Sequence, residues 1–295
     1  MTYCDQLKQP AAGGNILLYN RGMSSLRLFC LSSEDAGEVF LPDMSSLDAV
    51  TRQLPPGLYT TFRTYDERQR VLGLRLHLER IYGPAAGLGL RPPLDQAALR
   101  RVLSEILTIY RGEVRLRLVL AGDSQMYAAV EPLRTLPPQV YEQGVRVVTV
   151  RLHRQSPRVK STAFIEQSES PRRLLAESGA FEALMVRRGY ILEGLTSNFF
   201  YVRNGVLGTA QRGVLLGVTR RTVLRLARQL GMEVCYRPAR VDVPFDEAFL
   251  TSSSRGVVPI VAIDGKAVGD GRVGPWTRRL GQAYEAYVLQ AAEKL

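Results

Sequence analysis

Lys160 is the residue of this sequence best suited to act as a chemical group. Thirty-nine residues are basic, but only four are lysines: Lys8, Lys160, Lys266 and Lys294. Lys8 and Lys294 lie near the chain ends and Lys266 lies in an Asp-Gly-Lys turn, so Lys160 alone lies within the body of the chain. Arginine replaces lysine in most surface roles, but its guanidinium stays protonated and cannot form a Schiff base. The lysine retained at 160 therefore indicates a need for an amine, although a solvated surface cation explains it equally well.

Three segments after Lys160 carry polar groups of distinct kinds. Glu193 lies in ILEGLTSNFF, where Leu192 and Leu195 are expected to surround the carboxylate with apolar side chains. Gly217-Val218-Thr219 opens a helix, where Thr219 can act as a cap and free N–H groups can bind an anion. Thr251-Ser252-Ser253-Ser254 ends a strand with four hydroxyls in a row. Taken singly, each has a simpler structural explanation as a hairpin carboxylate, an N-cap or a loop.

Taken together, these groups match the requirements of pyridoxal phosphate (PLP). A lysine must hold the aldehyde as a Schiff base and move the α-proton of the substrate. An acidic group must face the pyridine nitrogen, so that the protonated ring accepts electrons. The phosphate needs a helix N-terminus, hydroxyls and an arginine. The order and spacing of the segments therefore favour a PLP enzyme with its Schiff base on Lys160.

The first half of the chain contains the pattern of a small α/β domain. Residues 1–55 show only short apolar pieces. Alternation and β-branched residues predict strands at 58–65 and 113–121, and charged residues at 66–69 predict a hairpin turn. Helical periodicity predicts helices at 75–86 and 95–110. We expect a first domain at 1–131 that includes the atypical extension 1–55, and a proline-bracketed linker at 132–138.

The second half, 139–295, mixes strands and helices and is expected to form a larger α/β domain. Strands are predicted at 145–150, 182–186, 198–202, 232–236 and 247–251, with a hairpin turn at Asn204-Gly205. Helices are predicted after Lys160, where Pro171 interrupts the segment, at 220–230, where Gly231 ends the helix, and at 276–294.

Composition narrows the possible partners and compartments. The net charge of +11 raises the possibility of a nucleic-acid partner. The arginines are scattered as singles and pairs, however, whereas nucleic-acid binders usually gather charge on one patch. No segment reaches the ~20 apolar residues of a membrane span, and the N-terminus lacks the pattern of a secretory signal. We therefore predict neither a nucleic-acid nor a membrane partner.

Histidine and cysteine usage argues against a metal site. The two histidines are too few for a histidine-rich site. The three cysteines, Cys4, Cys30 and Cys235, are far apart and odd in number, so they predict neither a disulfide framework nor metal-ligand spacing. We accordingly expect no metal and a reducing, cytoplasmic setting.

From about 160 to 279 the chain resembles the class IV aminotransferases, the fold-type-IV PLP enzymes. This family includes branched-chain and D-amino-acid aminotransferases and aminodeoxychorismate lyase. The matching segments appear in the family's order: RVKST, LEGLTSNFF, LLGVTRRTVLRLARQLG, DEAFLTSSSRGVVPI and IDGKAVGDGRVGPWTRRL. A weaker match covers GLYTTFRTY and LHLERI. The resemblance implies a small and a larger α/β domain, PLP as cofactor and a homodimer whose partner helps to wall the site.

The resemblance also implies roles for individual residues. Lys160 is the catalytic Schiff-base lysine, and Glu193 is the partner of the pyridine nitrogen. The remaining cofactor-binding residues are Arg80, Asn198, Val218, Thr219, Ser252 and Ser253, with Arg80 on the phosphate. Substrate-binding roles are expected for Tyr59, Thr60, Arg117 and Ser254.

Three departures from the family bear on the reaction. TRQLPP replaces the aromatic, Gly-Asp-rich segment before the first-domain strand, Thr60 replaces an acidic residue, and Ile165 replaces a tyrosine. The last two changes resemble the lyase branch. We expect an amino-acid aminotransferase acting on a small amino or keto acid. The alternatives are aminodeoxychorismate lyase, which eliminates pyruvate, and a non-catalytic binding protein of the same fold.

Overall fold

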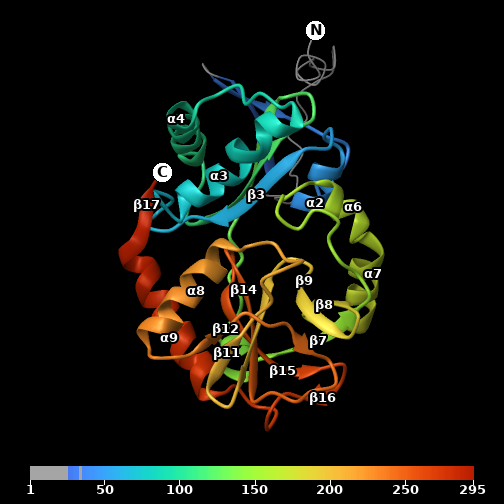
Figure 1. Cartoon of the computed structure of the whole chain (residues 1–295). Helices are drawn as coiled ribbons and strands as arrows, with labels where there is room; N and C mark the ends of the chain where they lie inside the picture. The colour runs from blue at the N-terminus through green and yellow to red at the C-terminus, as the bar shows by residue number, and fades with distance from the viewer. Residues whose placement is uncertain (1–25, 33–34) are drawn as a thin grey trace. The chain divides into compact units, whose positions relative to one another are not determined.

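The computed structural model describes residues 26–32 and 35–295, which form two compact units. Unit 1 contains the described residues up to Leu133 together with Ser161–Ile165 and Ala292–Leu295. Unit 2 contains Arg134–Lys160 and Glu166–Ala291. Figure 1 shows the elements of both units by chain position.

Unit 1 is built on a five-stranded antiparallel sheet with the strand order β2-β1-β6-β5-β3. Its strands are β1 (Arg27–Leu31), β2 (Ala36–Val39), β3 (Leu58–Arg63), β5 (Val114–Leu120) and β6 (Met126–Pro132). Its helices are α2 (Leu47–Arg52), α3 (Leu74–Ala85), η1 (Ala86–Leu88) and α4 (Gln96–Leu107). One face of the sheet packs on α2, and α3 packs on β3.

The elements of unit 1 follow the local sequence closely where periodicity is strong. α4 begins at its N-cap Asp95, whose carboxylate accepts a hydrogen bond from the N–H of Ala98, and its apolar stripe is buried. Residues 27–52 differ from expectation, because β1 and β2 extend the sheet and α2 packs against it. At the C-terminus, β17 (Ala292–Lys294) pairs with β4 (Arg70–Leu72), so the last residues form a strand rather than the end of a helix.

Unit 2 contains a sheet that closes on itself. The hydrogen-bonded path runs β10-β14-β15-β7-β8-β9 and returns through the pairing of β9 with β10. These strands are β7 (Val145–Val150), β8 (Glu182–Arg187), β9 (Tyr190–Gly194), β10 (Asn198–Arg203), β14 (Glu247–Ser252) and β15 (Gly256–Ile263). Short strands extend it: β11 (Val206–Gly208), β12 (Val234–Cys235), β13 (Ala239–Arg240) and β16 (Lys266–Ala267).

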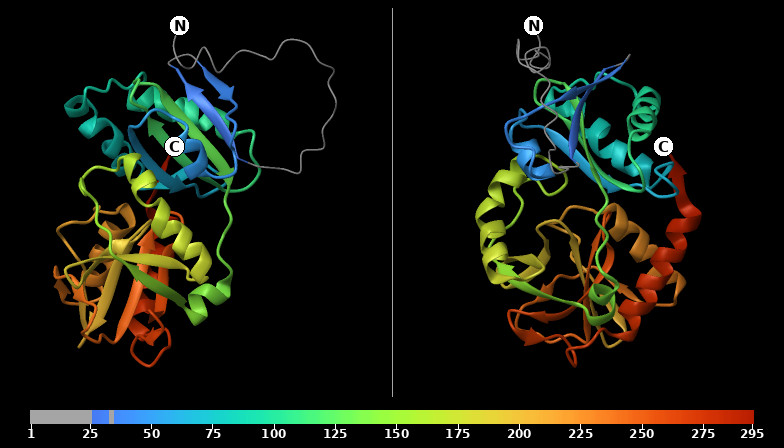
Figure 2. Two further views of the ribbon diagram at one scale, coloured as in Figure 1. Left: turned by 90° about the vertical axis from the view of Figure 1, so that its right-hand side faces the viewer. Right: turned by 180° about the vertical axis from the view of Figure 1, so that it is seen from behind.

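Helices cover the closed sheet of unit 2. α8 (Val218–Gln229) and α9 (Pro275–Ala291) pack against each other and against β14, as the views in Figures 1 and 2 show. The remaining helices of unit 2 are α5 (Pro138–Gln143) and α7 (Glu169–Ser178), whereas α6 (Ala163–Gln167) begins in the Ser161–Ile165 segment of unit 1. The interruption between α6 and α7 falls at Ser168, and Pro171 is accommodated in the first turn of α7, where its missing N–H costs no helical hydrogen bond.

Cys235 is free. Cys4 lies outside the described residues, so the expectation of no disulfide framework stays a prediction. Among the described residues, no helix is long and apolar enough to span a membrane, and no cluster of His, Cys, Asp and Glu could hold a metal.

Candidate active site

Three polar side chains lie in register across neighbouring strands of unit 2. Glu193 of β9 lies opposite Asn198 of β10, and Asn198 in turn lies opposite Thr251 of β14. Directly opposed residues of antiparallel strands place their side chains on the same face of a sheet. The strand pairing therefore brings one acidic, one amide and one hydroxyl side chain to a single face.

The carboxylate of Glu193 is almost completely buried, with 2% of the residue exposed. Nε of Arg154 donates to its Oε1 at 2.8 Å, and Nδ2 of Asn198 donates to its Oε2 at 3.0 Å. The main-chain N–H of Leu215 lies 3.2 and 3.1 Å from the two oxygens. The surroundings of Glu193 are thus polar and charged, contrary to the apolar pocket expected from Leu192 and Leu195.

Burial raises the pKa of Glu193, because desolvation disfavours the charged carboxylate. The positive charges of Arg154 and Lys160, and the hydrogen bonds from Arg154 and Leu215, act in the opposite direction. Lys160 is half-buried and lies near the end of the loop between β7 and α6. Its ammonium is thus within electrostatic range of the carboxylate that was predicted to work with it.

The N-terminus of α8 adjoins the same group of side chains. Gly217 is the N-cap, and its main-chain N–H donates to Oδ1 of Asn198 at 3.1 Å. Nδ2 of Asn198 also donates to the carbonyl of Leu215 at 2.7 Å. Asn198 therefore holds Glu193 and the first turn of α8 together. Thr219 lies one residue inside the helix and does not cap it.

Two buried hydroxyls at this place have no hydrogen-bond partner within the described part of the chain. They are Oγ1 of Thr219 and Oγ1 of Thr251, on residues that are each 2% exposed. Buried hydroxyls are normally satisfied, because an unpaired one costs about 1–3 kcal/mol. A twelve-residue helix also directs its unpaired N–H groups and the positive end of its dipole toward this point. The arrangement fits an anion such as a phosphate.

The turn after β14 is held by an ionic network. Nη2 of Arg255 donates to Oε2 of the buried Glu182 at 3.1 Å and to Oγ1 of Thr196 at 2.6 Å. Nε of Arg255 donates to Oγ of Ser252 at 3.2 Å. Thr196 lies in the turn between Glu193 and Asn198, so the network joins this turn to residues 252–255.

Comparison with known proteins identifies the family. Residues 57–263 match the family described as amino-transferase class IV, which covers more than half of the chain. The chain belongs to the class IV aminotransferases.

Individual relatives agree with this assignment. A D-alanine aminotransferase of Bacillus licheniformis is 27% identical and covers 82% of this chain and 91% of its own. A branched-chain-amino-acid aminotransferase of Pseudomonas aeruginosa is 27% identical and covers 77% of this chain and 82% of its own. The solved structure of the T.th. branched-chain amino acid aminotransferase with pyridoxamine 5'-phosphate has a TM-score of 0.72 at 23% identity. It covers 90% of this chain and 94% of its own. The two-part α/β fold, the aminotransferase family and its dependence on PLP are thereby confirmed.

Four residues that were predicted to bind cofactor or substrate lie in unit 1. Arg80 is half-buried on α3, and Tyr59 is buried on β3. Thr60 is fully buried, and its hydroxyl lies 2.7 Å from Nδ1 of His77 on α3. Its side chain therefore packs between β3 and α3, which argues against direct contact with a substrate.

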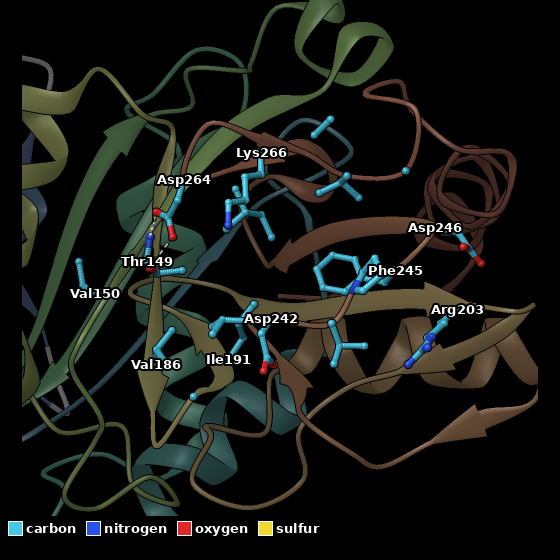
Figure 3. A pocket seen from close by; sticks show the side chains of 18 of the residues that line it. Thr149, Val150, Val186, Ile191, Arg203, Asp242, Phe245, Asp246, Asp264 and Lys266 are labelled. Atoms are coloured by element: carbon cyan, nitrogen blue, oxygen red, sulfur yellow. Dashed lines mark hydrogen bonds between the residues drawn. The ribbon is translucent and has the colours of Figure 1, made fainter.

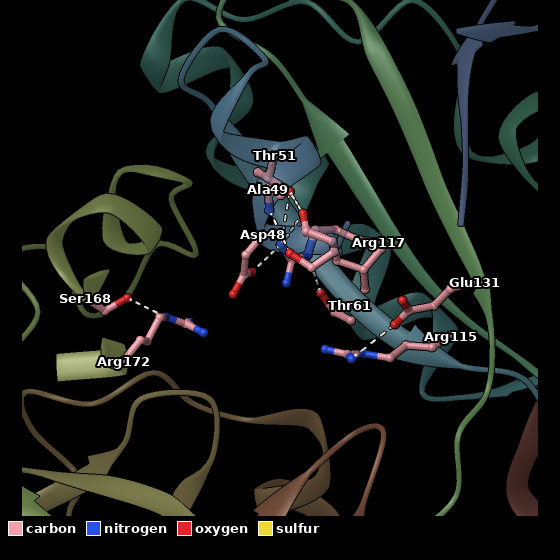
Figure 4. Close-up of polar contacts among 11 residues, drawn as sticks. Asp48, Ala49, Thr51, Thr61, Arg115, Arg117, Glu131, Ser168 and Arg172 are labelled. Atoms are coloured by element: carbon pink, nitrogen blue, oxygen red, sulfur yellow. Dashed lines mark hydrogen bonds and ion pairs between the residues drawn. The ribbon is translucent and has the colours of Figure 1, made fainter. Parts of the chain in front are cut away.

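Arg117 is buried and already paired within unit 1 (Figure 4). Its Nη1 donates to Oδ1 of Asp48 at 2.7 Å, and to the carbonyl of Leu47 and Oγ1 of Thr51, each at 3.0 Å. Its Nε donates to Oγ1 of Thr61 at 3.1 Å, and the guanidinium stacks on the ring of Tyr59 at 4.9 Å. A substrate carboxylate would have to displace these acceptors. This pairing argues against the predicted contact of Arg117 with the substrate carboxylate, which stays a prediction.

Arg154 was missed in the sequence. It is one of thirty-five arginines, lies outside every matched segment, and nothing in its neighbours signals burial. The ion pair between Glu182 and Arg255 was also missed, because it depends on the order of the strands in the sheet. The signal that could have found Arg154 is the requirement that a buried carboxylate have a charged partner.

A cavity of about 1040 Å³ lies elsewhere in unit 2 (Figure 3). Its lining includes Thr149, Asp242, Phe245 and Lys266, and none of the residues predicted to bind cofactor or substrate. The lining acids are engaged locally; Asp264, for example, accepts hydrogen bonds from the N–H and hydroxyl of Thr149. Lys266 is exposed there and provides a natural control for Lys160.

Proposed function

We propose that this class IV aminotransferase transfers the amino group of a small amino acid, with PLP covalently held on Lys160. One observation carries the proposal: within unit 2, Lys160 acts electrostatically on the buried carboxylate of Glu193, and Asn198 ties that carboxylate to the N-terminus of α8. An amine, a ring-nitrogen partner and an anion site are the three elements that PLP requires.

When bound, PLP supplies an electron-accepting ring that stabilises negative charge at the α-carbon of the substrate. The Nζ of Lys160 would hold the aldehyde, and as a free amine it would take and return the α-proton of the substrate. The carboxylate of Glu193 would hold a proton at the pyridine nitrogen. Val218, Thr219 and Ser253 are proposed to bind the phosphate, with Thr219 providing a hydroxyl that has no partner among the described residues. Ser252, Asn198 and Arg255 maintain the surrounding geometry.

The substrate proposal rests on the relatives. Their names point to branched-chain amino acids and to D-alanine. We therefore propose a small aliphatic amino acid, with the 252–254 turn presenting Ser254 and its amides to the carboxylate. Four further points are predictions from the resemblance and the sequence. They are the contact of Arg80 with the phosphate, the contact of Tyr59 with the substrate, a homodimer and a cytoplasmic location.

The covalent anchor can be tested directly. Purified protein with PLP should absorb in the visible range, and borohydride should fix the cofactor on the peptide containing Lys160. Lys160→Arg keeps the charge but should abolish fixation and activity, whereas Lys266→Arg should leave both unchanged. A protein that stays colourless with added PLP, or fixation at Lys266, contradicts the proposal.

The reaction type is tested with a panel of L- and D-amino acids and no keto-acid acceptor. Aminotransfer predicts one equivalent of keto acid per site and stoichiometric loss of the visible absorbance. Inertness to the whole panel, together with pyruvate release from aminodeoxychorismate, would replace the aminotransferase by the lyase.

A further inference from the structure

Arg154 forms a buried ion pair that the proposed function does not yet use. Its side chain is 4% exposed and that of Glu193 is 2% exposed, with 2.8 Å between Nε and Oε1. Nη2 of Arg154 also donates to the carbonyl of Leu195 at 3.3 Å. One guanidinium therefore holds both the carboxylate and the turn that follows it.

Three cations act electrostatically on the Glu193 carboxylate. Arg154 lies in the loop after β7, Lys160 lies at the end of that loop, and Arg220 lies on α8. Nε of Arg154 donates a hydrogen bond to the carboxylate at 2.8 Å. Nη2 of Arg220 donates instead to the carbonyl of Ala210 and to Oε1 of Gln211.

Removal of one partner from a buried ion pair leaves an uncompensated charge, which either costs stability or becomes neutral by taking up a proton. Burial already raises the pKa of Glu193, and Arg154 provides the largest opposing effect. Without Arg154, Glu193 would therefore take up a proton more readily. A neutral carboxylic acid is a poor partner for a protonated pyridine nitrogen.

We infer that Arg154 is a positioning residue that holds the Glu193 carboxylate ionised and correctly oriented toward the ring nitrogen of PLP. The inference rests on the proposed function. It assigns Arg154 no contact with substrate or cofactor. Its effect passes through Glu193, and this distinguishes it from a merely structural ion pair.

The test follows the visible absorbance of the holoprotein against pH. The group that titrates is the Schiff base on Lys160. Loss of the positive charge of Arg154 favours its protonated form, and so does loss of the proton on the pyridine nitrogen. Arg154→Met should therefore raise the midpoint of the absorbance titration by about one to three pH units, the range over which a neighbouring charge shifts a pKa. Arg154→Lys should stay closer to wild type. The exposed Arg151→Met in the same loop is the matched control and should not change the midpoint.

A double variant separates action through Glu193 from a general packing role. In a Glu193→Gln background, Arg154→Met should shift the midpoint much less than in the wild type. If Arg154→Met alone does not fold, Glu193→Gln should restore folding, because the unpaired carboxylate has been removed. A wild-type midpoint in Arg154→Met overturns the inference, as does a misfolded Arg154→Met that Glu193→Gln does not rescue. Wild-type protein that binds no PLP overturns the proposed function instead, before any variants are compared.

Discussion

Asn198 and Gly217 fit each other so closely that a side chain at 217 would clash with the side chain of Asn198. The N–H of Gly217 donates to Oδ1 of Asn198 at 3.1 Å, and a Cβ at 217 would lie 2.1 Å from that same oxygen. The backbone of Gly217 is in an ordinary extended conformation, so close approach and not a left-handed dihedral angle requires the glycine.

Gly217→Ala should therefore displace Asn198 and the first turn of α8. We expect PLP affinity to fall at least tenfold, and stability to fall by about 1–3 kcal/mol, as for other overpacked sites. The matched control is Gly281→Ala in α9, where an added Cβ meets nothing within 4 Å. Alanine favours helix by about 0.5–1 kcal/mol over glycine, so this control should be neutral or stabilising. Cofactor titration measures the PLP affinity, and urea unfolding measures the stability. If Gly217→Ala and Gly281→Ala had the same affinity and stability, the close contact between Gly217 and Asn198 would be contradicted.

Thr219→Val removes the buried hydroxyl without changing the shape of the side chain. If the hydroxyl binds phosphate, the PLP dissociation constant should rise about tenfold, which corresponds to about 1.4 kcal/mol. The apoprotein should be as stable as wild type or more so, because an unsatisfied buried hydroxyl is lost.

Thr222→Val is the control for Thr219→Val, since its buried hydroxyl faces the carbonyl of Val218 within the helix at 3.4 Å. Its PLP affinity should stay near wild type. Weakened binding in Thr222→Val to the same extent as in Thr219→Val would indicate a general effect on α8.

Glu193→Gln should retain PLP but lose most of the rate of α-proton removal, because the amide cannot hold the pyridine nitrogen protonated. The variant also reports on the pH dependence of the apoprotein. The folded-state pKa of Glu193 is raised above its ordinary value of 4.5 by burial. Its contribution to stability is thus fully present below that value and is lost as pH rises through the folded pKa. The unfolding free energy of wild type should fall relative to Glu193→Gln as pH rises above 4.5, and parallel curves would contradict the shift.

Helices and strands with a strong local sequence pattern were predicted best, and features that depend on long-range pairing were missed. The bounds of β7 were predicted to the residue and those of the amphipathic helix α4 to within three residues, because alternation, periodicity and caps are local. Strand β15 was missed because it runs through the unit 2 sheet with almost no polar alternation, as a strand buried on both faces does. The six-residue helix α2 is too short for periodicity to indicate it, and closure of the sheet through β9 and β10 depends on non-local pairing.

In the candidate site, too, the residues with a local sequence signal were predicted and their long-range partners were not. Lys160 stood out as an inner lysine in an arginine-rich chain, and Glu193, Asn198 and Thr219 lie in segments that resemble the family. Their partners could not be predicted. Arg154 reaches Glu193 across thirty-nine sequence positions, and Arg255 reaches Glu182 across seventy-three. Such pairings are set by strand order and by burial, neither of which the local sequence specifies.

Arg115 and Arg117 allow two ion pairs on one strand to be compared. Arg117 is 6% exposed in its side chain and pairs with Asp48, whereas Arg115 is 38% exposed and pairs with Glu131 (Figure 4). Breaking a buried pair leaves a charge without its partner and typically costs about 3–5 kcal/mol. An exposed pair is screened by water and contributes about 0–1 kcal/mol.

Arg117→Met should therefore lower the unfolding free energy by several times more than Arg115→Met. Asp48→Asn should cost less than Arg117→Met, because Arg117 keeps its hydrogen bonds to Leu47, Thr51 and Thr61. If Arg117 instead binds the substrate carboxylate, Arg117→Met should raise KM at unchanged stability. Urea unfolding together with steady-state kinetics on the same preparations decides between the two roles. A structural ion pair predicts a lower unfolding free energy for Arg117→Met. An Arg117→Met variant with wild-type stability and a raised KM would therefore show that Arg117 binds the substrate.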